Sequence, residues 1–363
     1  MSKKLMKGNE AIGEAAIVAG AQAYFCYPIT PQTEIAEYLA KRMPEVGGVF
    51  VQAESELAAS QMIFGAAATG ARVFTTSSSP GISLMGEAMS YIAAAELPAV
   101  FINIMRCGPG LGGILPSQGD YLQAVKGAGH GDYRFLVLAP STIQEAVDLT
   151  IEAFRLADKY LNPVLLIGDG LIGQMMEPVD FESCTKPPRL DCSAWATTGC
   201  AGREPHIVKT LFLDPNVLEE RNFRLKAKYE RMTREEIRFE TYGCDPPPDL
   251  LFAAYGTTAR VVRTAVDRLR EEGASVGMFR PISVFPFPDD ALRQVAHQPQ
   301  VHNVLVVEMS MGQMLEDVAR SSQGRKPLHF YGRGGGNVPG PEEIVAEVRK
   351  LLDGKKRKAG GAA

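Results

Sequence analysis

The chain has 363 residues, which is long for one domain, so two domains are expected. Its apolar content of 45% and charged content of 22% are ordinary for a folded protein, and its net charge of −4 gives no reason to expect nucleic acid or an anionic membrane as a partner. No apolar run approaches the roughly 20 residues that span a bilayer, and residues 1–7 lack the apolar core of a secretory signal, so we expect the cytoplasm.

The first half of the chain alternates predicted helices and strands. The strands are continuous apolar runs, which is typical of a parallel sheet covered on both faces. We expect strands at 23–27, 49–53, 72–75, 99–105, 135–139 and 164–167, and helices at 8–19, 31–42, 55–69, 83–95 and 142–159. This pattern predicts an α/β fold with a doubly wound parallel sheet over residues 1–185.

Two neighbouring strands of this domain end in polar segments. The first runs into Tyr27-Pro28-Ile29-Thr30-Pro31, and the second into Glu54-Ser55-Glu56. Carboxyl ends of neighbouring strands line the ligand crevice of an open α/β sheet, so Thr30 and Glu56 are candidate site residues. We favour Glu56 over Glu54, because Glu54 would point to the opposite face if the strand continued. Thr30 is also expected to cap the helix that begins at Pro31.

Two further segments follow the next strands. The stretch Thr76-Ser77-Ser78-Ser79-Pro80-Gly81 is expected to be a polar loop. Arg106 ends the strand at 99–105 and is the only basic residue between positions 73 and 125. A surface arginine is one interpretation, and bidentate recognition of a carboxylate is the other. Its place at a strand end beside flexible glycines favours the second.

The segment Gly108–Gly113 has the spacing G-x-G-x-x-G of dinucleotide-binding proteins. That function requires a helix to open at the third glycine, and Pro116 disfavours a helix there. We therefore favour a mobile glycine-rich lid over a Rossmann-type dehydrogenase.

The second half of the chain contains a linker and a smaller domain. Residues 186–248 are predicted to be a linker with a charged helix at 219–240, and residues 249–353 a smaller α/β domain with strands at 250–254, 275–279 and 304–308. Residues 354–363 are expected to be a flexible tail. The six cysteines have no C-x-x-C spacing, so we expect reduced thiols and no metal site in this chain.

Taken together, the segments resemble the α chain of the 2-oxoacid:ferredoxin oxidoreductases, and most closely the branched-chain type that uses 3-methyl-2-oxobutanoate. The strings that carry this resemblance run in order along nearly the whole chain: Lys7-Gly8-Asn9-Glu10-Ala11, Tyr27–Pro31, Glu54-Ser55-Glu56, Ser79-Pro80-Gly81, Arg106, Pro116-Ser117-Gln118-Gly119-Asp120, Arg280-Pro281, Pro286-Phe287-Pro288, Glu308, Gly312-Gln313 and Gly332-Arg333-Gly334-Gly335.

The resemblance implies a site for thiamine diphosphate. Residues 1–185 would bind its aminopyrimidine, and residues 249–353 would form a transketolase C-terminal-like domain. Glu56 matches the activating glutamate, and Thr30 and Arg106 match the contacts to the substrate carboxylate. The pocket would be lined by Tyr27, Pro28, Ile29, Ser78, Ser79, Pro80 and Gly81.

The resemblance also implies partners and a reaction. A β chain would hold the diphosphate and Mg²⁺, and iron–sulfur clusters would sit on partner chains. Gamma and ferredoxin-like delta chains are further candidates, with ferredoxin as the electron acceptor. The assembled enzyme would convert a 2-oxoacid and coenzyme A to an acyl-CoA and CO₂, and this chain would be active only with the β chain. The alternatives are the α chain of a 2-oxoglutarate enzyme and a non-catalytic scaffold subunit.

Overall fold

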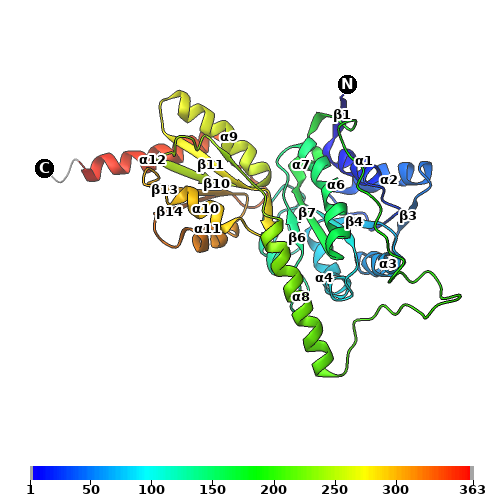
Figure 1. Cartoon of the computed structure of the whole chain (residues 1–363). Coiled ribbons are helices and arrows are strands. Elements are labelled where there is room, and N and C mark those ends of the chain that lie inside the picture. Colours follow the sequence, from blue (N-terminus) through cyan, green and yellow to red (C-terminus); the bar gives the residue numbers. More distant parts are fainter. Residues whose placement is uncertain (1–2, 360–363) are drawn as a thin grey trace.

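Two α/β units lie side by side in the chain, and a long helix runs along their junction (Figure 1). The structure is a computed structural model, which describes the backbone of residues 3–359 and the side chains of residues 3–351. The C-terminal unit holds the yellow-to-red part of the chain, and the N-terminal unit the blue-to-green part. Within residues 3–359, no helix combines the length and apolar character that crossing a bilayer requires.

The larger sheet belongs to the N-terminal unit and has seven strands. All its strand pairings are parallel except one at the edge of the sheet, where β12 pairs with β6 in the antiparallel direction. In spatial order the strands are β12 (Ser283–Phe285), β6 (Leu136–Leu138), β7 (Pro163–Asp169), β5 (Ala99–Met105), β4 (Val73–Ser77), β2 (Ala23–Cys26) and β3 (Val49–Gln52). Every residue of β5 and β7 is buried, which explains why these central strands are continuous apolar runs. The predicted α/β fold class is confirmed.

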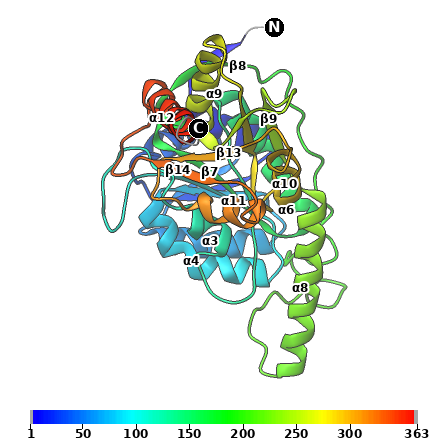
Figure 2. The same ribbon diagram turned by 90° about the vertical axis from the view of Figure 1, so that its left-hand side faces the viewer.

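The helices of this unit form two groups. Helix α1 packs on α2 and α6, and α3 packs on α4. Figure 2 shows α3 and α4 together below the sheet. The helices are α1 (Gly8–Val18), α2 (Thr33–Glu45), α3 (Glu56–Ala68), α4 (Ser79–Ala94), α5 (Tyr121–Lys126), α6 (Ile143–Tyr160) and α7 (Gly170–Gln174). A small antiparallel sheet of β1 (Lys4–Lys7) and β8 (Met176–Val179) stands beside them.

The smaller sheet has five strands and its own apolar core. In spatial order they are β14 (Leu328–Gly332), β13 (Asn303–Glu308), β10 (Leu250–Ala253), β11 (Val276–Pro281) and β9 (Phe239–Tyr242). Only β9 is antiparallel to its neighbour, and it lies within the range that we expected to be linker. The helices are α9 (Gly256–Glu271), α10 (Asp289–Ala296), α11 (Met314–Ser322) and α12 (Pro341–Ala359). The expected tail is thus helical to Ala359, and its remainder, 360–363, lies outside the described residues.

The two units are joined by a buried glutamine. Gln118 donates from Nε2 to the carbonyl oxygen of Tyr255 at 2.8 Å. Its Oε1 accepts from the Thr258 hydroxyl at 2.7 Å and from the Met309 backbone nitrogen at 2.9 Å. Because all these groups are buried, the bonds hold the segment after the glycine-rich loop against the second unit.

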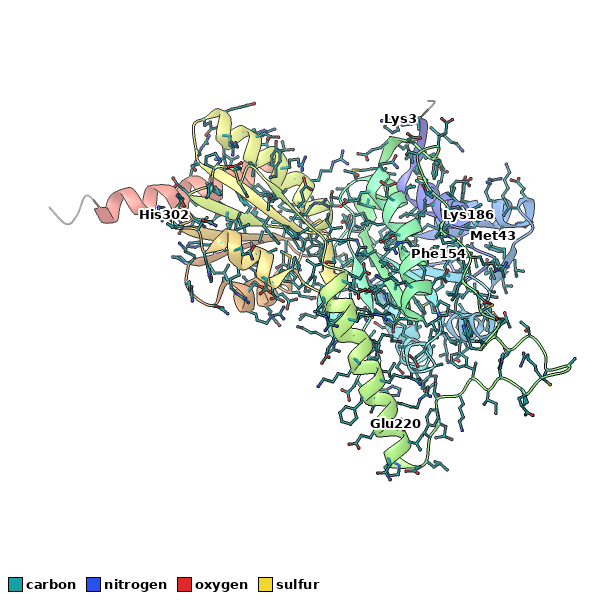
Figure 3. The ribbon with its side chains drawn as sticks, viewed as in Figure 1. Lys3, Met43, Phe154, Lys186, Glu220 and His302 are labelled. Atoms are coloured by element: carbon teal, nitrogen blue, oxygen red, sulfur yellow. The ribbon has the colours of Figure 1, made fainter. Side chains whose placement is uncertain are left out.

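The charged segment forms helix α8 (Pro215–Glu235), which begins and ends about four residues earlier than expected. Asp214 is the N-cap residue, and its carboxylate accepts a hydrogen bond from the backbone nitrogen of Asn216. Pro215 occupies the first position of the helix, where its missing N–H would have no partner in any case. The helix buries only Leu225, Tyr229 and Met232. Figure 3 labels Glu220 on the part of α8 that extends below the body of the molecule.

Arg72 ties the start of the linker to the first unit. Its guanidinium donates to the Asp158 carboxylate at 2.6 Å and to the carbonyl oxygens of Ala19 and Pro187 at 2.8 and 3.1 Å. It also hydrogen-bonds the carbonyl oxygen of Pro188. The Arg72 and Asp158 side chains are 8% and 12% exposed. The ion pair is therefore buried, and each side chain neutralises the charge of the other where water cannot solvate it.

We expect Arg72→Ala to lower the free energy of unfolding by about 3–5 kcal/mol, because the Asp158 carboxylate would be left buried without its partner. Urea denaturation of the purified chain measures this loss. The matched control is Arg155→Ala, whose pair with Glu152 is 43% and 23% exposed. The control should cost less than about 1 kcal/mol. Equal losses in the two variants would contradict the assignment.

Candidate functional site

The candidate residues gather at the carboxyl edge of the large sheet. Strands β2, β4 and β5 end there, and helices α3 and α4 begin there. This is the position at which open parallel sheets bind ligands.

Glu56 is the first residue of α3. The preceding Ser55 is the N-cap, and its hydroxyl oxygen accepts from the backbone nitrogen of Ala58 at 3.2 Å. The Glu56 side chain is 6% exposed, whereas Glu54 is exposed to solvent. Within the described residues no hydrogen bond reaches the Glu56 carboxylate. The positive end of the α3 dipole stabilises a negative charge at this position.

The Glu56 carboxylate lies directly against the first turn of α4. A Cβ atom placed on Gly81 would stand 2.7 Å from Glu56 Oε1 and 2.1 Å from Ser77 Oγ. Any side chain at Gly81 would therefore displace one of these groups. The glycine keeps open the space where the carboxylate and the hydroxyl meet.

The serine-rich segment is not the loop that we expected. Strand β4 continues to Ser77, and α4 begins at Ser79, four residues before the predicted start. Pro80 is tolerated because the first turn of a helix has no partner for its backbone nitrogen in any case. Ser78 thus forms the whole connection, and Ser79, Pro80 and Gly81 occupy the first turn of α4.

Arg106 follows β5 and is 8% exposed, so it is not a surface arginine. Its Nη1 donates to the carbonyl oxygen of Thr30 and its Nη2 to that of Leu111, both at 3.1 Å. Its Nε is buried and has no hydrogen-bond partner. The guanidinium therefore links the end of β2 to the glycine-rich loop and retains an unused donor.

Thr30 lies beside Arg106 but does not cap α2. That helix begins at Thr33 with Gln32 at the N-cap, so the expected capping role of Thr30 is wrong. The chain instead makes a turn before the helix, in which the Gln32 nitrogen donates to the carbonyl oxygen of Ile29 at 3.0 Å, so Thr30 is not next to the first helical residue. Thr30 is exposed, as is Tyr27, while Pro28 and Ile29 are partly buried.

Asp120 completes the polar cluster and was not among the predicted site residues. Its Oδ2 accepts from the Ser79 hydroxyl at 2.5 Å and from Asn103 Nδ2 at 2.9 Å. Ser79 Oγ in turn accepts from the backbone nitrogen of Arg106 at 3.0 Å. Burial raises the pKa of Asp120, against the opposing effects of the two hydrogen bonds and the nearby charge of Arg106. The sequence offered one signal, the string Pro116–Asp120, but not the contact with Ser79.

The glycine-rich loop closes on itself beside Arg106. The Cys107 nitrogen donates to Leu115 at 3.0 Å, and the Gly113 nitrogen donates to Cys107 at 2.8 Å. No helix opens at Gly113, since α5 begins only at Tyr121, and this contradicts the Rossmann alternative. The mobility of the loop stays a prediction.

The cysteines and acidic residues form no metal centre in the part of the chain that the structure describes. All six cysteines are free thiols. Within residues 3–359, no group of three or more histidine, cysteine or acidic side chains is placed to hold an ion.

Two families match the chain, one for each unit. "Pyruvate flavodoxin/ferredoxin oxidoreductase, thiamine diP-bdg" matches residues 14–206, and "Pyruvate:ferredoxin oxidoreductase core domain II" matches residues 248–344. The first family model covers Glu56, Arg106 and Asp120, and therefore the whole polar cluster at the carboxyl edge of the large sheet.

Proteins of known sequence and structure are similar over nearly the whole chain. The Ketoisovalerate oxidoreductase subunit VorB of Methanothermobacter thermautotrophicus is 48% identical, over 97% of this chain and 98% of its own. The 2-oxoglutarate synthase subunit KorA of Archaeoglobus fulgidus is 38% identical, over 97% and 100%. A 2-oxoglutarate:ferredoxin oxidoreductase from Magnetococcus marinus, solved with 2-oxoglutarate, coenzyme A and succinyl-CoA, is 28% identical with a TM-score of 0.86. It covers 96% of this chain, which spans 65% of that longer one. The chain belongs to the 2-oxoacid:ferredoxin oxidoreductase family, as a subunit of the alpha type.

Proposed function

We propose that the chain is the catalytic α subunit of a thiamine-diphosphate-dependent 2-oxoacid:ferredoxin oxidoreductase, and that it activates the cofactor through Glu56. The observation that carries this proposal is a buried carboxylate that has no hydrogen-bond partner among the described residues and faces the carboxyl edge of a parallel sheet. A charge in such a place is costly unless a ligand completes its bonds.

The residues at this edge fit the aminopyrimidine of thiamine diphosphate. Glu56 would hold a proton between its carboxylate and the pyrimidine ring nitrogen, and Gly81 leaves room for that contact. The bound cofactor supplies a carbon nucleophile and an electron sink for decarboxylation. Pocket walls would come from the two segments that flank Glu56 and Arg106: Tyr27, Pro28, Ile29, Ser78, Ser79, Pro80 and Gly81.

Arg106 and Thr30 would hold the carboxylate of the 2-oxoacid. The buried, unpartnered Nε of Arg106 is a charged donor that a carboxylate oxygen could satisfy. Thr30 is exposed beside it and offers a hydroxyl. Because Thr30 and Leu111 already accept from the two Nη atoms, the guanidinium is oriented before substrate arrives.

Other parts of the reaction would come from partner chains. We assign the diphosphate and Mg²⁺ to a β chain and the iron–sulfur clusters to further subunits, in line with the alpha-type character of the chain. Gamma and ferredoxin-like delta chains are candidate partners, coenzyme A the co-substrate and ferredoxin the electron acceptor. Free thiols at all six cysteines support a reducing compartment, which we take to be the cytoplasm.

The substrate that we propose is 3-methyl-2-oxobutanoate. Between positions 73 and 125 Arg106 is the only cation, and it would be used by the 2-oxoacid end. A second carboxylate, as in 2-oxoglutarate, would need another cation. The apolar side chains nearby are Ile82 and Met85, which are buried, and Leu84, Leu111, Ile114 and Leu115, which are exposed. The two ketoisovalerate relatives, at 48% and 46% identity, are also closer than the 2-oxoglutarate relative at 38%.

The assembled complex with thiamine diphosphate, coenzyme A and ferredoxin tests this proposal. We expect kcat/KM for 3-methyl-2-oxobutanoate to exceed that for 2-oxoglutarate by at least about tenfold, because burying a branched tail gains roughly 1.5–3 kcal/mol. A preference for 2-oxoglutarate would overturn the substrate but not the reaction. A complex with no 2-oxoacid activity of either kind would overturn the proposed function.

A further inference from the structure

Three hydroxyl groups near the end of β4 are buried without any hydrogen-bond partner. They belong to Thr75, Ser77 and Ser78. Buried polar groups almost always have a hydrogen-bond partner, because an unpaired one loses its hydrogen bonds to water and gains no bond in the protein. Alanine at Ser77 would remove that penalty with little change in volume. Where such a hydroxyl also lies against a functional group of the site, it points to a bond that forms only in another state of the site.

Ser77 is the member of this group that lies against the candidate carboxylate. Its Oγ and Glu56 Oε1 stand 2.1 and 2.7 Å from one common point, the position of a Cβ on Gly81. Ser77 is fully buried, at 0% exposure. The two oxygens therefore border the same small space. Catalytic hydrogen bonds are often long until the ligand is bound.

We propose that Ser77 is a positioning residue for Glu56. In the cofactor-bound complex the Ser77 hydroxyl donates a hydrogen bond to Oε1 of Glu56. That bond fixes the glutamate rotamer in which the other carboxylate oxygen faces the pyrimidine ring nitrogen. This inference rests on the proposed function, and it adds a residue that holds the activating group without touching substrate.

The need for such a bond follows from the surroundings of Glu56. Its flexible side chain has no other hydrogen bond among the described residues, and Gly81, which lies against it, has no side chain that could hold it. A proton shared at one atom requires that the carboxylate be held within a fraction of an ångström. Ser77 is an unused donor beside this carboxylate, and the pairing of β4 with β5 at Asn103 fixes its backbone.

The test is Ser77→Ala in the complex assembled with its partner chains, thiamine diphosphate and Mg²⁺. We expect kcat to fall about tenfold to a hundredfold, as for the loss of one hydrogen bond to a charged group. Exchange of the thiazolium C2 proton of the bound cofactor with deuterium, followed by quenched NMR, should slow by the same factor. KM for the 2-oxoacid should not change, and the melting temperature should stay equal or rise, because an unpaired buried hydroxyl is removed.

Thr75→Val is the matched control. It removes a second buried and unpartnered hydroxyl from the same strand with an isosteric side chain, and it should leave the exchange rate at the wild-type value. Wild-type exchange in Ser77→Ala, with Glu56→Gln slow, would overturn this inference and leave the proposed function standing. Equal slowing in Thr75→Val would also overturn it, because packing of β4 would then explain the effect. Wild-type exchange in Glu56→Gln would instead overturn the proposed function itself.

Discussion

Glu56→Gln should slow turnover of the assembled complex by about 100-fold or more, the usual effect of removing a group that transfers a proton. The amide has the size of the carboxylate but cannot take up a proton at the position that the pyrimidine ring nitrogen requires. Assembly should be unchanged, because the side chain contributes no hydrogen bond within the described residues. Steady-state turnover with saturating 2-oxoacid, coenzyme A and ferredoxin measures the loss.

Glu54→Gln provides the control, since Glu54 lies two residues away and is exposed. It should retain turnover close to that of the wild type. The same comparison separates the catalytic subunit from a scaffold. If Glu56→Gln turned over at the normal rate, the chain would support the complex without taking part in catalysis.

Arg106→Lys should lower kcat/KM for the 2-oxoacid by about 100-fold, the order expected when a buried charged hydrogen-bonding partner is lost. Lysine keeps the charge but carries all its donors on one nitrogen, so it cannot reach Thr30, Leu111 and the substrate from three separate positions, as the guanidinium can. KM should rise more than kcat falls, because Arg106 would bind the substrate carboxylate in the ground state, and the charge on that group does not grow as CO₂ leaves.

Arg221→Lys is a suitable control for this substitution. Arg221 also donates to a backbone carbonyl, that of Ala94 at 3.2 Å, but from helix α8. Its substitution should leave both kinetic constants unchanged. If Arg106→Lys raised KM no more than the control did, Arg106 would be a structural tie between β2 and the glycine-rich loop and not a substrate contact.

The fold could be predicted where local pattern and burial agree. Strand β5 was expected at 99–105 and forms at Ala99–Met105, because each of its residues is buried and the apolar run has no gap. Helix α4 was placed too late, because Ser79-Pro80-Gly81 has the composition of a loop. Neither β9 nor β12 was predicted, since short strands gain their stability from a distant partner and not from their own sequence.

In the candidate site, too, local sequence features could be predicted and contacts between distant segments could not. Glu56 and Arg106 could be named as candidates because a charged residue at a strand end is visible in the sequence, and their catalytic and binding roles stay predictions. The preference for Glu56 over Glu54 assumed that the strand continued, whereas the structure buries Glu56 as the first residue of α3. The bonds of Asp120 to Ser79 and Asn103 join residues far apart in the chain, so no local pattern announces them.

Because β12 pairs with β6, the large sheet cannot be completed until residues 283–285 have been synthesised. Residues 283–285 come after three of the five strands of the second unit, yet they supply the edge strand of the first. A ribosome-bound chain that has emerged only to residue 206 must leave one side of β6 open, and an open strand edge invites pairing with other chains. About eighty more residues must be synthesised between residue 206 and the end of β12, which then covers this side of β6. A chaperone that shields this edge, or prompt translation through Phe285, would protect the growing chain from aggregation.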